Sequence, residues 1–282
     1  MNADNSSEPK RLIHLLELAD QYTNPYDNTN MKKLAMHLME KPPTDDYIPD
    51  KDIKAHLKSQ QQPFIDAFLI HQRPYLEKKW IVHLFTAEHG LLPSITHQSK
   101  KKRELLQLFN PLSCQVLVRG QMSQLKQVEW SQCIAPLHGN YVFAGLYINE
   151  LIYKLCQANQ ASPELFSLYQ ACIKQLSLRQ DLALIVRTFE YHLQNLLGYS
   201  PNYEIIHDHD ASWFSFDSER GLKPSVTASS QRYAREHLLS LAEGKLDTPE
   251  VQSISKHIFA RVLKQLLGEK SLFISQMLPK SI

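Results

Sequence analysis

The pattern of hydrophobic and polar positions changes at about residue 63. Residues 64–130 contain short runs rich in β-branched, aromatic and aliphatic side chains, and turn-like groups such as Arg73-Pro74-Tyr75 and Arg119-Gly120-Gln121 separate them. Such runs, bounded by turn residues, are typical of strands. The predicted strands are Phe64–His71, Trp80–Thr86, Leu91–Thr96, Leu112–Arg119 and Gln124–Trp130.

After Trp130 the apolar positions recur at helical spacing, which predicts a second domain of a different class. Trp213–Phe216 followed by Glu219–Gly221 predicts a small β-hairpin between helices. The predicted helices are Tyr141–Ala158, Pro163–Ser177, Asp181–Leu197, Ser230–Ala242 and Thr248–Leu267.

Together these elements predict an α+β fold. Residues 63–132 form a five-stranded barrel, and residues 133–282 form an α-helical domain with a small β-hairpin insertion. The OB-fold is the commonest five-stranded barrel that binds single strands, so it is the predicted type, with an SH3-like barrel as the alternative. The polar residues 1–62, rich in Asn, Asp, Pro and Gln clusters, predict a flexible N-terminal extension, although a docking helix for a partner remains open.

The helix expected after residue 139 contains residues that helix propensity alone would not choose. Asn140 is the candidate N-cap. Gly145 costs about 1 kcal/mol relative to Ala, so we expect it to allow close approach of a neighbouring element. Asn149 and Glu150 lie in the same apolar stretch and would need polar partners if buried. We expect these residues to organise the core where the helices meet the barrel.

Composition excludes several classes of protein. With 43% hydrophobic residues in 282, the chain can bury a proper core, and its N-terminus has no signal-peptide pattern. The four scattered cysteines favour reduced thiols in a cytoplasm over disulfides or a cysteine zinc site. No nucleophile-elbow, phosphate-loop or dinucleotide motif is present, so we do not expect an enzyme.

The positive charge gathers in the predicted barrel, where residues 63–130 hold nine Lys and Arg against five Asp and Glu. Lys100, Lys101, Lys102 and Arg103 form a run that is either a solvated loop or a contact for a polyanion. Aromatic side chains nearby could stack bases. The other candidate DNA-binding residues of the barrel are Arg73, Tyr75, Lys78, Lys79, Trp80 and Arg119.

His207-Asp208-His209-Asp210 is the one cluster that suggests a metal site. In an extended segment the two histidines point to one side and the two aspartates to the other, so one ion could not easily use all four. A polar turn is the favoured interpretation, and a metal-dependent nuclease is the least favoured alternative. We expect no metal or cofactor.

Several short strings, in one order from about Phe64 onward, resemble the RecO family of bacterial recombination mediators. The most specific is Phe143-Ala144-Gly145-Leu146-Tyr147-Ile148-Asn149-Glu150-Leu151, which is similar to the signature helix of that family. The others are Phe68–Tyr75, Phe85–Gly90, Asn110–Leu112, Arg187–Glu190, Leu196–Tyr199 and Met277–Lys280.

The resemblance implies a DNA-repair protein of the bacterial cytoplasm and nucleoid, in which an OB-fold binds single-stranded DNA. It also implies annealing of complementary strands, recognition of the acidic, Phe-ended tail of single-stranded-DNA-binding protein, and loading of RecA with the help of RecR. Lys154, Arg179 and Arg187 are the candidate cations for that tail. The four-cysteine zinc cluster of many relatives is absent here. An adaptor that bridges repair proteins without touching DNA is the alternative function.

Overall fold

A computed structural model describes residues 63–118, 120, 122–225, 232–268 and 272–278. The predicted flexible extension of residues 1–62 lies outside these ranges, and so does the candidate residue Arg119. Residues from Phe64 onward form one compact unit. No helix among the described residues is long and apolar enough to cross a membrane.

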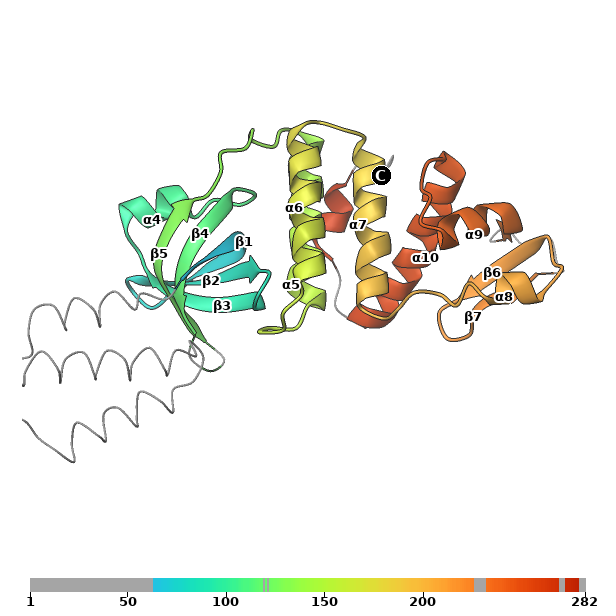
Figure 1. Ribbon diagram of the computed structural model, residues 1–282, viewed down its shortest axis with the longest axis horizontal. Coiled ribbons are helices and arrows are strands. Elements are labelled where there is room, and N and C mark those ends of the chain that lie inside the picture. Colours follow the sequence, from blue (N-terminus) through green and yellow to red (C-terminus); the bar gives the residue numbers. More distant parts are fainter. Residues whose placement is uncertain (1–62, 119, 121, 226–231, 269–271, 279–282) are drawn as a thin grey trace, which may run out of the picture. The chain divides into compact units, whose positions relative to one another are not determined.

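The first part of this unit is a closed five-stranded barrel, as predicted (Figure 1). The strands follow the order β1-β2-β3-β5-β4, and all neighbours are antiparallel except β3 and β5. This order, with a helix between the third and fourth strands, confirms the OB-fold. The strands are β1 Phe64–Tyr75, β2 Lys79–Thr86, β3 Gly90–His97, β4 Pro111–Leu117 and β5 Ser123–Trp130.

Two local predictions in the barrel are wrong. Arg73-Pro74-Tyr75 continues β1 instead of turning, and the turn follows at Leu76, whose φ is 54°. The basic run is not a loop but the helix α4, Lys100–Leu105, whose N-cap Ser99 accepts a hydrogen bond from the Lys102 backbone N–H at 3.2 Å. A helix this short has no apolar periodicity, so hydrophobic pattern could not reveal it.

The second part of the unit contains helices and a small sheet. Its three-stranded sheet has the order β7-β6-β8, which confirms the hairpin predicted near Trp213 and adds a two-residue strand that was not predicted. The helices are α5 Asn140–Leu155, α6 Pro163–Ser177, α7 Leu182–Leu196, α8 Ile205–Asp208, α9 Arg235–Ala242, α10 Pro249–Leu267 and the 3-10 helix η1 Ile274–Met277. The strands are β6 Trp213–Asp217, β7 Gly221–Pro224 and β8 Tyr233–Ala234.

Most helix ends differ from prediction by a few residues, and side chains cap only some of them: Asp181 caps α7 and Thr248 caps α10, whereas α5 and α6 have no side-chain cap. α6 begins and ends as predicted, with Pro163 in its first turn. Asp181 caps α7 from outside the helix and accepts a hydrogen bond from the Leu184 N–H. Asn140 is wrong as an N-cap: it is the first helical residue, and Gly139, which has no side chain to cap with, precedes it.

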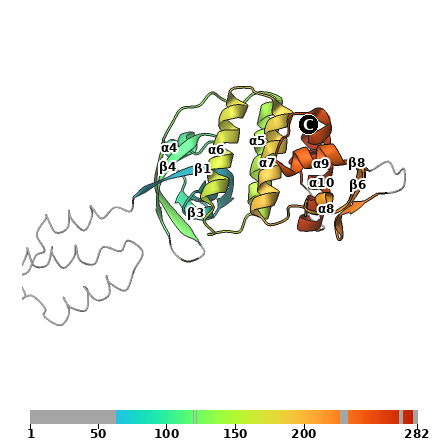
Figure 2. The same cartoon turned by 45° about the vertical axis from the view of Figure 1, so that its right-hand side comes forward.

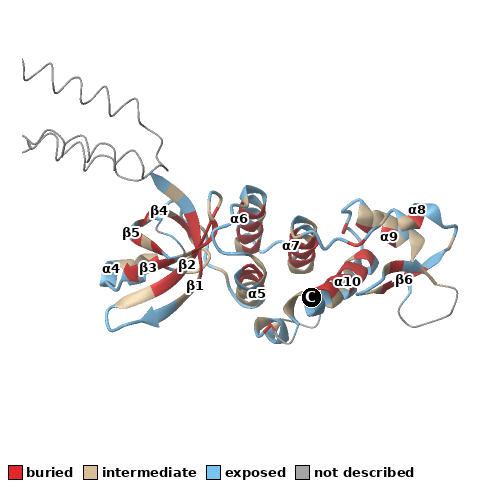
Figure 3. Cartoon of the chain, turned by 90° about the horizontal axis from the view of Figure 1, so that it is seen from below, coloured by how far each residue is buried: buried red, intermediate tan, exposed pale blue. Residues whose placement is uncertain are grey.

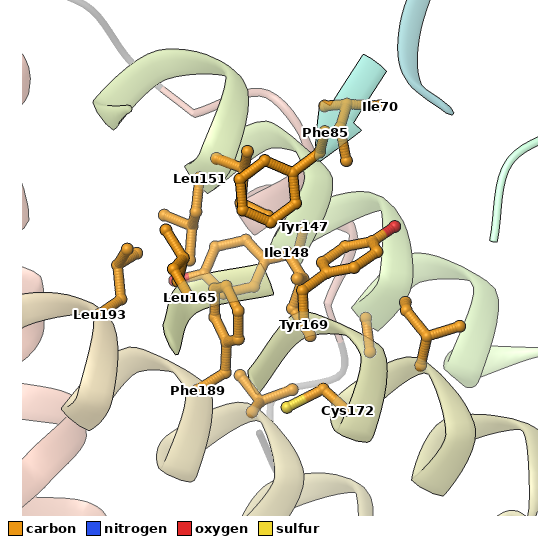
Figure 4. Packing of buried hydrophobic residues seen from close by; sticks show 14 of the residues in the cluster. Ile70, Phe85, Tyr147, Ile148, Leu151, Leu165, Tyr169, Cys172, Phe189 and Leu193 are labelled. Carbon is orange, nitrogen blue, oxygen red and sulfur yellow. The ribbon is translucent and has the colours of Figure 1, made fainter. Parts of the chain in front are cut away.

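One hydrophobic core is shared by the barrel and the first three long helices. Phe68, Ile70, Phe85 and Leu91 of the barrel pack in the same cluster as the inward faces of α5, α6 and α7. Figure 2 shows these three helices side by side, and Figure 3 shows their buried faces. The ring of Tyr169 meets that of Phe68 edge-on at 4.9 Å between centroids. Figure 4 shows part of this packing.

The signature helix α5 packs into that shared core. Two of its three unusual residues, Gly145 and Asn149, make the close contacts that we expected there. A Cβ on Gly145 would lie 2.7 Å from the Phe109 ring, which confirms the close approach. The Asn149 amide donates to the Ile70 carbonyl at 3.3 Å and accepts from the Tyr169 hydroxyl at 2.8 Å. Glu150 differs from the expectation, because the partners of its carboxylate lie in the C-terminal segment and on α5 itself.

Glu150 instead fastens the C-terminal segment to α5. Its carboxylate accepts the backbone N–H groups of Phe273 and Ile274, each at 2.9 Å, and pairs with Lys154 at 3.1 Å. These interactions hold the start of η1 against the helix. The backbone hydrogen bonds and Lys154 lower the pKa of this carboxyl group, outweighing the opposing effect of its partial burial.

Candidate nucleic-acid interface

The outer surface of the barrel is organised in rows, because residues paired across neighbouring strands point to the same face. One row runs from Tyr75 on β1 through Lys79 on β2 to His97 on β3. The next row, reached two residues along each strand, runs from Arg73 through Ile81 and Ile95 to Gln124 on β5. The third row contains His71, His83 and Pro93.

The helical domain covers one half of this outer face. Beyond the third row lie Phe68, Phe85 and Leu91, which are buried in the shared core. The third row itself is closed by Tyr153 of α5, whose ring lies 4.7 Å from that of His71 and 4.9 Å from that of His83. Burial, and then the nearby charge of Arg73, lowers the pKa of His71; burial, His71 and Arg73 together lower that of His83 to about 4. Both rings are therefore neutral at pH 7.

The other half of the face is made of the first two rows, whose side chains are exposed or partly exposed except for Ile81, which is 2% exposed. We call it the free half-face; its members are Arg73, Tyr75, Lys79, Ile81, Ile95, His97 and Gln124. Arg73, Tyr75 and His97 are exposed, and Lys79 and Gln124 are partly so. The two rows contain two permanent cations and no carboxylate. Such a surface attracts an anionic partner and offers it two rings on which to stack.

The register separates the predicted interface residues into two groups. Arg73, Tyr75 and Lys79 lie together on the free half-face, and Lys78 is exposed in the adjoining turn beside Glu77. Trp80 points the other way, into the end of the barrel, where it packs against the barrel core. The Arg103 guanidinium lies 5.9 Å from the Trp80 ring centroid. Trp80 is therefore placed to support α4 and not to present its ring on the outer face.

The α4 helix lies at the end of the barrel nearest the first row. Only Gln98 and Ser99 separate it from His97, and the Gln98 N–H donates to the Lys78 carbonyl at 2.9 Å. Lys100, Lys101 and Arg103 are exposed on this helix. These three cations therefore extend the positive charge of the free half-face around the barrel end.

Lys102 differs from the other cations of the run, because its ammonium is used inside the barrel end. It donates to the Thr96 hydroxyl at 2.7 Å and to the Leu125 carbonyl at 3.2 Å. Burial, together with the neighbouring charge of Lys126, lowers the pKa of Lys102. The residue thus anchors α4 to β3 and β5, a structural role that the run of cations concealed.

Sequence reasoning missed His97, Gln124 and Lys126 on this side of the barrel. Each lies at the end or on the outer side of a strand, where alternation of side chains places it at the surface. Alternation within β3 and β5 was therefore a usable signal. The pairing of β3 with β5, which brings Gln124 next to Ile95, was not readable from either strand alone.

The candidate cations of the helical domain have three different environments. Arg187 is 4% exposed and forms a buried ion pair with Glu190, which also accepts a hydrogen bond from Tyr147 at 2.6 Å. Arg187 is therefore a core residue and is not presented to a peptide. Lys154 is paired with Glu150 at 3.1 Å, whereas Arg179 is exposed at the turn between α6 and α7 with φ 54°.

His207-Asp208-His209-Asp210 does not form the predicted turn throughout. Ile205–Asp208 is the short helix α8, and His209 follows it with extended backbone. Within the described ranges no group of three or more His, Cys, Asp or Glu residues is placed to hold a metal ion.

Comparison with known proteins identifies the family. The "Recombination protein O N terminal" family matches residues 64–134, and the "Recombination protein O C terminal" family matches residues 138–250. The DNA repair protein RecO of Nitrosospira multiformis is 29% identical over 239 residues, which are 79% of this chain and 97% of that protein. The RecO protein of Stutzerimonas stutzeri is 31% identical over 217 residues, 73% and 89% of the two chains. That of Actinobacillus succinogenes is 28% identical over 220 residues, 75% and 93%. With its barrel and its helical half both matched, the chain belongs to the RecO family of DNA repair proteins.

Proposed function

We propose that this protein is a non-catalytic recombination mediator that binds single-stranded DNA through the free half-face and the exposed cations of α4. The observation that carries the proposal is the free half-face itself, where Arg73 and Lys79 lie among Tyr75 and His97 with no carboxylate in either row. Membership of a DNA-repair family supports the choice of DNA as the anion.

The arrangement favours a single strand over a duplex. Tyr75 and His97 flank Lys79 in one row, so rings and a cation alternate across three neighbouring strands. Unpaired bases can stack on such rings while cations meet the phosphates, whereas the bases of a duplex are already stacked on each other. Binding of this kind tolerates any sequence, since every base has a flat face.

The proposal extends to annealing and to RecA loading. A mediator that holds a strand by its backbone and by loosely stacked bases leaves base edges available for pairing with a complementary strand. We propose that it acts with RecR to load RecA onto strands coated by single-stranded-DNA-binding protein. The acidic, Phe-ended tail of that protein would meet Arg179, next to which Leu178 is 60% exposed and offers an apolar contact.

Salt-dependent binding of a fluorescent 20-nucleotide strand tests the DNA-binding part. The log–log slope of affinity against salt falls by roughly 0.7 for each phosphate contact that is lost. Replacing Arg73 and Lys79 together by Ala should therefore lower affinity and flatten the slope by roughly 1.4. The triple variant Lys100→Ala, Lys101→Ala, Arg103→Ala removes three cations from α4 and should flatten the slope by roughly 2.1. Lys102 is kept because it anchors the helix.

Lys264→Ala, on the exposed side of α10, is the matched control and should keep the wild-type slope. An unchanged slope in the Arg73 and Lys79 variant would show that DNA does not lie on the free half-face. Absence of binding by the wild-type protein at low salt would instead favour the adaptor, which bridges repair proteins without holding DNA.

A further inference from the structure

A hollow lies within the free half-face, between the ends of three strands. Lys79 of β2, Ile95 and His97 of β3, and Ser123 and Gln124 of β5 line it, together with Met122 just before β5. Its volume is about 210 Å³. A single water needs roughly 10–15 Å³ of such space, so the hollow is much larger than a water or a bare ion requires.

The lining combines an apolar surface with polar groups at one side. Ile95 and the thioether of Met122 are apolar, and Met122 is 37% exposed beside Gln124. Lys79 supplies donors only, and the Gln124 amide supplies both a donor and an acceptor. None of the lining residues is acidic. A phosphate alone would leave the apolar part of this lining unused, whereas a flat heterocycle with polar edges matches both parts.

We propose that the hollow holds one unstacked base of the bound single strand. Met122 and Ile95 contact the face of the base, while the Gln124 amide meets its edge, and the flanking phosphates lie over Lys79, Arg73 and the α4 cations. Proteins read single strands in this way when they splay a base out of the stack and bond its edge. The inference rests on the proposed function, because it places a subsite within the same DNA path.

The position of the hollow favours a base of the bound strand as its occupant. Lys79 and His97 belong both to the row that begins at Tyr75 and to the lining, so a strand that follows this row passes over the hollow. The hollow also lies beside the parallel pairing of Ser94 and Ile95 with Ser123 and Gln124. That pairing closes the barrel here, and it fixes the spacing between the polar edge and the apolar lining.

The test compares two strands that carry the same phosphates. One is a fluorescent 20-nucleotide oligothymidine, and the other is an abasic strand of equal length built from tetrahydrofuran units. Each is titrated with the full-length wild-type protein and with Met122→Ala, Gln124→Ala and the double variant. A stacked base contributes about 1–3 kcal/mol, or roughly five- to 150-fold in affinity. The ratio of the two dissociation constants measures the total contribution of the bases.

We expect the double variant to lower that ratio at least fivefold while its affinity for the abasic strand and its salt slope stay at the wild-type values. Gln127→Ala, an exposed glutamine of the same strand outside the hollow, should leave the ratio unchanged. A wild-type ratio in the double variant would overturn the base site and leave the proposed function standing. Equal loss for both strands would also overturn it, since the hollow would then bind phosphate. If the wild-type protein bound neither strand, the proposed function itself would fail.

Discussion

The side-chain hydrogen bonds of Asn149 join the barrel to the helical domain. Removing them should lower the free energy of unfolding of the protein by a large fraction. Asn149 is 3% exposed on α5. Its amide donates to the carbonyl of Ile70, a residue left out of the strand register by the bulge between Leu69 and His71. Its oxygen accepts from the hydroxyl of Tyr169 on α6, which is 0% exposed. One side chain therefore satisfies two buried groups from different elements.

The cost of Asn149→Ala follows from what it leaves behind. The Tyr169 hydroxyl and the Ile70 carbonyl would each lose their partner, and an unpaired buried polar group costs about 1–3 kcal/mol. We expect a loss of about 2–5 kcal/mol, against a total of about 5–15 kcal/mol for a typical domain. Asn149→Asp keeps the acceptor for Tyr169 but offers no donor to Ile70, so at pH 7 we expect it to be at least as damaging.

Urea unfolding followed by circular dichroism measures these losses as shifts of the midpoint at constant slope. The sharper measurement is a double-mutant cycle with Tyr169→Phe, for which we expect a coupling energy of about 1–2 kcal/mol. Gln175→Ala, an exposed amide on α6, is the matched control and should change stability by less than about 0.5 kcal/mol. Additive effects of the two changes within about 0.3 kcal/mol would refute the hydrogen bond between Asn149 and Tyr169.

Three further predictions concern the shared core, the histidine row and the helical surface. Gly145→Ala should destabilise the protein by about 1–2 kcal/mol, because crowding of the Phe109 ring outweighs the gain of about 1 kcal/mol in helix propensity; a raised thermal midpoint would contradict this packing. His83 has a folded pKa of about 4, below its unfolded value of 6.5, so the unfolded state binds the proton more readily and stability falls as pH drops from 6.5 towards 4. His83→Gln should lose less stability than wild type between pH 7 and pH 4.5 in urea unfolding, and an equal loss would show that this ring does not titrate on unfolding. Arg179→Glu should weaken binding of an acidic, Phe-ended peptide at least tenfold in a fluorescence titration while DNA binding is retained, and unchanged peptide affinity would exclude Arg179 as its contact.

Local sequence patterns accounted for most of the elements. Alternation of apolar residues located five strands to within a few residues, except where β1 continues past Pro74. Helical periodicity and the Pro163 start signal located α6 at its observed ends. These features succeed because strand and helix periods depend on neighbouring residues. The α4 helix and the two-residue strand β8 were not predicted, because each is too short to show a periodic apolar pattern and is held by contacts with other elements.

The candidate interface shows what local sequence patterns could not predict. Composition located the positive charge in the barrel, and Arg73, Tyr75 and Lys79 were named from their local context. Their position next to His97 depends on the register between strands, which the sequence of a single strand does not specify. The run from Lys100 to Arg103 looks uniform along the chain, yet Lys102 is turned inward to Thr96.

The sequence by itself therefore determined the family, the barrel followed by helices, and the concentration of positive charge in the barrel. The tertiary structure alone decided which cations face solvent, as the contrast between the buried Arg187 and the exposed Arg179 shows. It also decided which outward-facing rows of the barrel are exposed and which one Tyr153 of α5 contacts. The physical reason is that periodicity and composition are local properties, whereas burial and cross-strand pairing depend on residues distant in the chain.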